Sequence, residues 1–208
     1  IVVSEYGLVP VHRPVHLNRY LREMDWLTVR RGPFGEMMMP GESDAFAVAD
    51  HQLAHVYVRN PAMIDEVAKA LQSVPGVARV SRPVELELDH PRSGELIVLS
   101  EPDAWFTYYY WLDDSRAPDF ARTVDIHRKP GYDPCELFMT SKVRAMSRLA
   151  QKKIGLRYKM DVIPLDAKLV RGSHGLQTQP EKGPVIVGPG ELPDDMRDFK
   201  AYVQRLLT

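Results

Sequence analysis

The residues best suited to chemistry gather in five short polar segments, which lie between glycines, prolines and the ends of predicted strands. Histidine and carboxylate side chains are the usual ligands of zinc and other divalent metals in hydrolytic sites. None of the segments has a compact ligand spacing such as HExxH, so each is a weak signal by itself. The segments are residues 4–7 (SEYG), 50–51 (DH), 88–91 (LDHP), 125–134 (DIHRKPGYDP) and 172–175 (GSHG).

His174 is the strongest single candidate among them. It stands in a tight loop between Gly172 and Gly175, where the glycines let the backbone bend sharply and fix one imidazole in place. Such a histidine is hard to explain as part of an apolar core, so the sequence favours a metal ligand.

Two other segments, each with an Asp followed by a His, could be either turns or metal sites. Asp50 and His51 fit a hairpin turn as well as a ligand pair. For Asp89 and His90 turn chemistry is favoured, because Asp before Pro-x-x-Gly is typical of turns. Segment 125–134 combines many polar groups with stiffening Pro and Gly residues, which favours a site over a solvated charge pair.

Composition sets outer bounds on the function. A net charge of −1 makes nucleic acid a poor candidate partner. No apolar run approaches the ~20 residues that span a bilayer, and no secretory signal is visible, so no membrane partner is expected. Cys135 is the single cysteine, which excludes an intrachain disulfide and fits a reducing, cytoplasmic location. We interpret it as structural.

Hydrophobic periodicity predicts an α/β fold. Asn60 and Pro61 suit the start of a helix with a stripe of Ile64, Val67 and Leu71, and strands are expected on both sides of it. The expected strands cover residues 45–50, 55–59, 77–82 and 95–100, with further helices over residues 141–154 and from Pro193 onward. Residues 103–134 are too long for an ordinary connection, which indicates a functional loop.

The apolar start Ile1-Val2-Val3 predicts a buried strand at the centre of a parallel sheet. A chain that opens on a core strand is expected to have lost the part that preceded it. We therefore expect residues 1–208 to be the C-terminal part of one domain, inactive alone, completed by a missing N-terminal half or by a homodimer that covers the open edge.

The order of motifs is more specific than any one of them. It resembles the C-terminal half of type I phosphodiesterase/nucleotide pyrophosphatase proteins of the alkaline phosphatase superfamily, over most of residues 1–188. The motifs are SEYG (4–7), HVYV (55–58), PGVARV (75–80), RSGEL (92–96) and GSHG (172–175).

This resemblance implies a three-layer α/β/α fold, here incomplete, and metal ligands at matching positions. His174 matches a late histidine ligand, and Glu5 matches an aspartate ligand with one added methylene. Tyr6 replaces the histidine that follows that aspartate, so either the metal differs, another residue supplies the ligand, or one metal is lost. The family nucleophile, a Thr or Ser, would precede Ile1.

Segment 125–134 has no counterpart in the family pattern and is expected to compensate. Asp125 or His127 would reach a metal, with Asp50 and His51 as further candidate ligands, and Arg128 or Lys129 would stabilise the phosphate. The expected cofactors are divalent ions, zinc first, then manganese or magnesium.

The expected activity is hydrolysis of a phosphodiester or pyrophosphate, with a small phosphate ester or nucleotide as substrate. Two alternatives stay open. One is a degenerate member that binds a ligand or partner without catalysis, and the other is a phosphomonoesterase or phosphomutase on the same scaffold.

Overall fold

The chain has a mixed α/β fold in two compact units, which confirms the predicted class. The computed structural model describes residues 1–207, apart from the side chain of Pro180. One unit combines Ile1–Val9 with Gln177–Thr208, and the other is Pro10–Leu176. The helices are α1 (Leu17–Glu23), α2 (Ile64–Gln72), α3 (Lys142–Lys153) and α4 (Phe199–Leu207). The strands are β1 (Val2–Val3), β2 (Val9–Pro10), β3 (Arg13–Val15), β4 (Val29–Gly32), β5 (Gly35–Met38), β6 (Ala45–Asp50), β7 (Leu53–Val58), β8 (Val77–Ser81), β9 (Leu96–Ser100), β10 (Ala104–Phe106), β11 (Gly172–Ser173) and β12 (Ile186–Val187).

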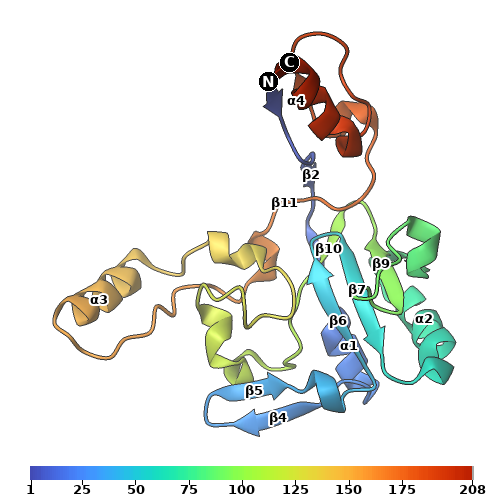
Figure 1. Ribbon diagram of the computed structural model, residues 1–208. Helices are drawn as coiled ribbons and strands as arrows, with labels where there is room; N and C mark the ends of the chain where they lie inside the picture. Colours follow the sequence, from blue (N-terminus) through green and yellow to red (C-terminus); the bar gives the residue numbers. More distant parts are fainter. Residues whose placement is uncertain (208) are drawn as a thin grey trace. The chain divides into compact units, whose positions relative to one another are not determined.

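The larger unit is built on a four-stranded sheet with the order β6-β7-β9-β8 (Figure 1). Strand β9 lies between β7 and β8 and runs antiparallel to both, so β7 and β8 are parallel to each other. Helix α2 connects them. This is the predicted β-α-β passage, and all four predicted strands are present within one or two residues.

Helix α2 follows from local sequence. The Asn60 side chain accepts a hydrogen bond from the Ala62 N–H, which caps the turn that leads into the helix. Ile64, Val67 and Leu71 are buried, as expected for one apolar stripe. The predicted N-cap and core face are therefore confirmed.

The outer edge of β6 is closed by other parts of the same unit. Buried Asn18 donates to the Ala47 carbonyl at 2.8 Å and accepts from the Ala47 N–H at 2.7 Å. Further along the strand, the Tyr132 N–H donates to the Ala49 carbonyl at 2.8 Å. Gly131 forms a parallel bridge with Ala49. These bonds fix segment 125–134 beside the end of β6.

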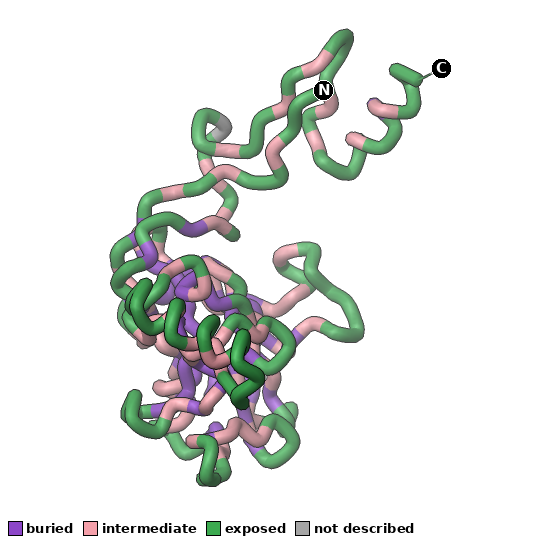
Figure 2. The backbone as a smooth tube through the Cα atoms, turned by 90° about the vertical axis from the view of Figure 1, so that its left-hand side faces the viewer, coloured by how far each residue is buried: buried purple, intermediate pink, exposed green. Residues whose placement is uncertain are grey.

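The start of the long segment 103–134 is core, where a functional loop was predicted. Strand β10 pairs in parallel with β3, and the aromatic side chains that follow it are almost completely buried. Figure 2 shows most of the buried residues, in purple, away from the two chain ends. The chain here forms neither a regular helix nor a long strand, so its aromatic residues do not recur at a helical or strand spacing. The sequence pattern therefore did not reveal that they are buried. The buried rings include Trp105, Phe106, Tyr108, Tyr109, Tyr110 and Trp111.

The prediction of a buried central parallel strand at Ile1–Ser4 is wrong. Strand β1 pairs antiparallel with β12 in a two-stranded sheet, and Val2 is 69% exposed. A short apolar run indicates a strand. Whether that strand is buried depends on residues elsewhere in the chain, which the run itself does not specify. In the same unit α4 buries Tyr202, whose hydroxyl donates to the Pro189 carbonyl at 2.9 Å.

Strands β4 and β5 form an antiparallel hairpin. Helix α3 is present as predicted, but it has no buried residue. Its apolar stripe is exposed. Among the described residues, no helix is both long and apolar enough to cross a bilayer.

Candidate active site at the turn between β6 and β7

The turn between β6 and β7 brings two of the predicted site segments together. His51 and Gln52 form a two-residue hairpin loop, and His51 adopts a φ of +58°. A left-handed conformation is uncommon for a residue other than glycine and concentrates at functional sites. The Gln52 N–H donates to the His174 carbonyl at 2.9 Å, and the His51 carbonyl accepts from the Phe106 N–H at 2.7 Å. The turn is therefore held in place by two distant parts of the chain.

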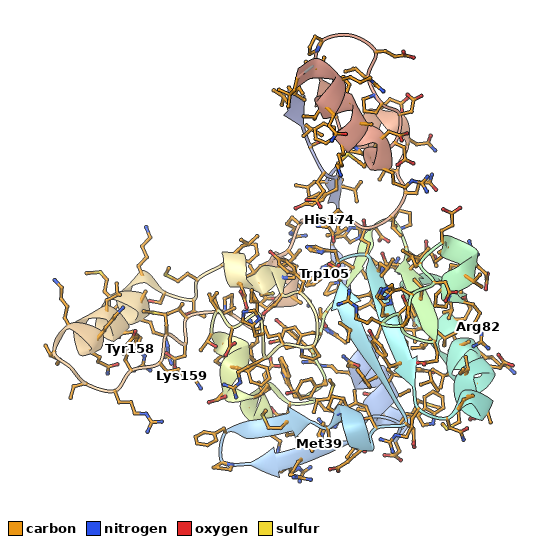
Figure 3. All side chains as sticks on the ribbon, in the orientation of Figure 1. Met39, Arg82, Trp105, Tyr158, Lys159 and His174 are labelled. Carbon is orange, nitrogen blue, oxygen red and sulfur yellow. The ribbon has the colours of Figure 1, made fainter. Side chains whose placement is uncertain are left out.

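The rings of His51 and His174 are in contact. Their centroids lie 3.8 Å apart with an angle of 33° between the planes. The ring of Tyr132 also stacks on His51, with the centroids 4.5 Å apart. Figure 3 labels His174, which belongs to the larger unit. Gly175, with a φ of +116°, supplies the left-handed turn that directs the chain away after His174.

Asp50 orients the imidazole of His51. Its Oδ1 lies 2.7 Å from His51 Nδ1. This hydrogen bond is the main reason why the pKa of Asp50 is lowered, and the nearby His174 acts in the same direction. An ionised carboxylate only accepts hydrogen bonds, so Nδ1 carries the proton. In the neutral ring Nε2 is then an acceptor, free to take a proton or a ligand.

Segment 125–134 contributes a cavity next to Asp50, of about 360 Å³. Tyr132, which touches His51, also lines it. That segment 125–134 lines an active site stays a prediction. The cavity is lined by Val48, Ala49, Asp50, Ile126, Lys129, Gly131, Tyr132, Asp133 and Glu136.

Lys129 is buried in an ion-pair triad. Its Nζ lies 2.7 Å from Asp133 and 2.6 Å from Glu136, and its side chain is completely inaccessible. Burial raises the pKa of Asp133, although the Lys129 charge acts against that shift. The two carboxylates neutralise the charge of Lys129. Lys129 therefore forms buried ion pairs and also lines the cavity.

Arg128 is also held by carboxylates. It lies 3.5 Å from Asp119 and 3.8 Å from Asp125, and its guanidinium stands over the Phe120 ring at 4.7 Å. His127 is exposed. Asp125 therefore faces Arg128, and among the described residues no contact joins Asp125 or His127 to His174. Their roles as ligands stay predictions.

Glu5 belongs to the smaller unit and is exposed there, whereas the histidine cluster belongs to the larger one. Its predicted role as a metal ligand also stays a prediction.

The divalent metal implied by the family pattern does not fit these side chains as a complete site. Within residues 1–207, no group of three or more His, Cys, Asp or Glu side chains is arranged to hold a metal ion. His51 and His174 are adjacent, but the nearest carboxylate, on Asp50, is engaged by His51 Nδ1. An ion at this turn would need donors beyond this set.

Cys135 is not placed to act as a nucleophile. The Tyr109 hydroxyl lies 3.4 Å from its sulfur, and burial raises the pKa of the thiol to about 12. A thiol that stays protonated at neutral pH is a poor nucleophile. The structural interpretation of Cys135 fits this environment.

Tyr132 is the residue of the cluster to which sequence reasoning gave no role. The signal available was its position between Gly131 and Asp133. Gly131 has a φ of +121°, and a Cβ there would lie 2.2 Å from the Ala49 carbonyl oxygen. The glycine lets the segment approach β6 closely, and that approach places Tyr132 against His51.

With this geometry established, comparison with known proteins identifies the class. Residues 1–133 match the model of the type I phosphodiesterase / nucleotide pyrophosphatase family, so the chain belongs to that family. The resemblance found from the motifs is thereby confirmed. No curated protein sequence matches the chain.

Two solved structures to which the chain is similar are crystal structures of phosphonoacetate hydrolase from Sinorhizobium meliloti 1021. The complex with phosphonoacetate has 17% identity and a TM-score of 0.38, and the match covers 56% of this chain and 29% of that one. The complex with phosphonoformate has 18% identity and a TM-score of 0.36, over 50% and 27%. The match thus spans less than a third of the length of either structure.

Proposed function

We propose that the protein is a phosphoester hydrolase that cleaves a phosphodiester or pyrophosphate bond, with the turn between β6 and β7 in its active site. The observation that carries this proposal is the contact of His51 with His174, beside a cavity, in a chain of this family. Two imidazoles and a carboxylate in contact are suited to proton transfer at phosphate oxygens.

In this proposal His51 acts as a general acid or base. Asp50 fixes the tautomer and the direction of the ring, which leaves Nε2 to exchange a proton with the attacking or the leaving oxygen. The His174 ring, packed against His51, restricts its motion and offers a second polar edge. The Tyr132 ring, stacked on His51, also holds the imidazole in place.

The two cations of segment 125–134 have no direct part in this mechanism. Lys129 is neutralised by Asp133 and Glu136. Arg128 is shared between Asp119 and Asp125. Both would have to leave carboxylate partners to bind a phosphate, which costs most for the buried Lys129.

We also propose that the activity depends on a divalent ion, and the only support for this is membership of the family. Because the described side chains do not form a three-donor group, no step is assigned to the ion here. The same observation favours a second candidate function, in which the chain binds a phosphate-containing ligand without hydrolysing it.

The test uses the protein expressed from its complete reading frame, with bis(4-nitrophenyl) phosphate as substrate. His51→Ala should lower kcat by about 10²- to 10⁴-fold, the usual contribution of a general acid or base. His90→Ala is the matched control, because His90 is exposed and its ring accepts a hydrogen bond from the Arg92 N–H within its own turn. Hydrolysis unaffected by His51→Ala would overturn the assignment.

Measuring the metal content of the same sample tests whether the activity depends on a divalent ion. Activity that is lost with a chelator and restored by Zn²⁺ or Mn²⁺ would support a metal-dependent hydrolase. Binding of inorganic phosphate without turnover under any metal would instead support the non-catalytic function.

A further inference from the structure

Helix α3 presents its apolar side to solvent. Val143 is 77% exposed, Met146 69%, Leu149 51% and Ile154 71%. These residues recur at helical spacing and lie on one face with Ala150. An exposed apolar stripe of this kind normally marks an interaction site.

The polar side of the same helix is turned toward its own chain. Arg144 and Arg148, one turn apart, both pair with Asp161 on the segment that returns from the helix. At the base of this arm the Thr140 N–H donates to the Val162 carbonyl at 2.8 Å, and Lys159 pairs with Asp119. The ion pairs therefore hold α3 so that its apolar side faces outward.

The arm is strongly basic. Residues 142–159 contain seven basic residues and no acidic one, in a chain whose net charge is −1. Lys142, Lys152, Lys153 and Arg157 are exposed, and within residues 1–207 none of the four has an ion-pair partner. Tyr158 lies in the same arm, with Lys152 over its ring at 5.8 Å, and Figure 3 labels it beside Lys159.

We propose that this basic arm, residues 142–159, docks on the surface of an anionic lipid bilayer. Valine, methionine, leucine and isoleucine side chains would enter the headgroup boundary, while the unpaired lysines and Arg157 meet lipid phosphates and carboxylates. A helix with one apolar face, a basic polar face and low average hydrophobicity is the usual form of such an interfacial helix.

This proposal differs from the sequence-based expectation of no membrane partner, which rested on the absence of a spanning segment. Interfacial binding needs only one apolar face. A second copy of the chain is the less suitable occupant, because pairing two copies of α3 would bring like charges together.

The test is flotation of the protein expressed from its complete reading frame, with vesicles of phosphatidylcholine alone or with 30 mol% phosphatidylserine added. Binding is expected to the anionic vesicles only. Lys152→Glu/Lys153→Glu should weaken it by at least about 25-fold, since each cation near an anionic surface contributes about fivefold. Raising the salt concentration should weaken it as well.

Met146→Glu/Leu149→Glu should abolish binding. The matched control is Val84→Glu/Leu137→Glu, which adds the same two charges at apolar residues that are 68% and 78% exposed outside the arm. Circular dichroism and thermal melts check that each variant is folded.

Two results would overturn the proposal. One is a folded wild-type chain that floats with neither kind of vesicle. The other is a dimer in sedimentation analysis, formed without lipid and abolished by Met146→Glu/Leu149→Glu, which would assign the apolar face to a second copy.

Discussion

The imidazole rings of His51 and His174 lie 3.8 Å apart, measured between their centroids. A backbone hydrogen bond from the Gln52 N–H to the His174 carbonyl also connects the two loops. The side-chain contact and the backbone bond are independent of each other. A variant that removes one ring should therefore leave the turn folded, which allows function and stability to be separated.

His174→Ala is predicted to lower phosphodiester hydrolysis by about 10²-fold or more in the protein expressed from its complete reading frame. The thermal unfolding midpoint should change little, because the backbone bond from Gln52 remains. Steady-state kinetics and differential scanning calorimetry measure the two effects. Full activity in the folded variant would contradict a role for His174.

Asp50→Asn tests the orientation of His51. Losing the charge-assisted bond should lower kcat by about tenfold to 100-fold, equivalent to roughly 1.5–3 kcal/mol. The comparison variant is Asp89→Asn, in a turn outside the cluster. Equal losses in the two variants would argue against a specific role of Asp50.

The same substitution has a consequence for pH dependence. The folded-state pKa of Asp50 is below its ordinary value of 3.8, chiefly because of the bond from His51. Its carboxylate thus contributes stability above pH 3.8 that is lost as the pH falls through the folded-state pKa. Melting temperatures between pH 2.5 and 6 should fall less steeply for Asp50→Asn than for wild type, and identical slopes would refute this.

Lys129→Met tests the buried triad. Removing the cation leaves Asp133 and Glu136 without their partner, which should cost about 3–5 kcal/mol at pH 7. Burial already raises the pKa of Asp133, so its ionised form is disfavoured in the folded state. The loss should therefore shrink as the pH falls and Asp133 takes up a proton.

Urea unfolding at pH 7 and pH 4.5 measures this difference. Arg128→Met, at the exposed neighbouring position, should cost about 1 kcal/mol or less. If the loss of unfolding free energy in Lys129→Met does not depend on pH, the contribution of Lys129 to stability comes from packing and not from its ion pairs.

Gly131→Ala should destabilise the protein and misplace Tyr132. The new Cβ would lie 2.2 Å from the Ala49 carbonyl oxygen, in addition to the strain of a φ of +121°. Gly155→Ala is the matched control, because Gly155 also has a positive φ but open space around its Cβ position. The control should lose about 1 kcal/mol and Gly131→Ala clearly more. Equal losses in urea unfolding would show that the close approach to Ala49 is unimportant.

Several features were determined by the sequence itself. The cap at Asn60 and the stripe of α2, the four strands of the central sheet and the order of the family motifs all depend on neighbouring residues, whose preferences for strand, helix and turn are local. The glycine-flanked loop at His174 was visible for the same reason.

Only the tertiary structure decided which of these segments meet. Asp50 and His51 fitted a turn or a ligand pair equally well, and the structure gives a turn whose histidine touches His174. Lys129 was indistinguishable from a surface cation until Asp133 and Glu136 closed around it. Long-range contacts depend on how strands pair and which faces are covered, and single-chain periodicity carries no information on either. For this reason the strand at Val2–Val3 was predicted to be buried but is exposed, and the spacing of the apolar residues of α3 did not reveal that they face solvent.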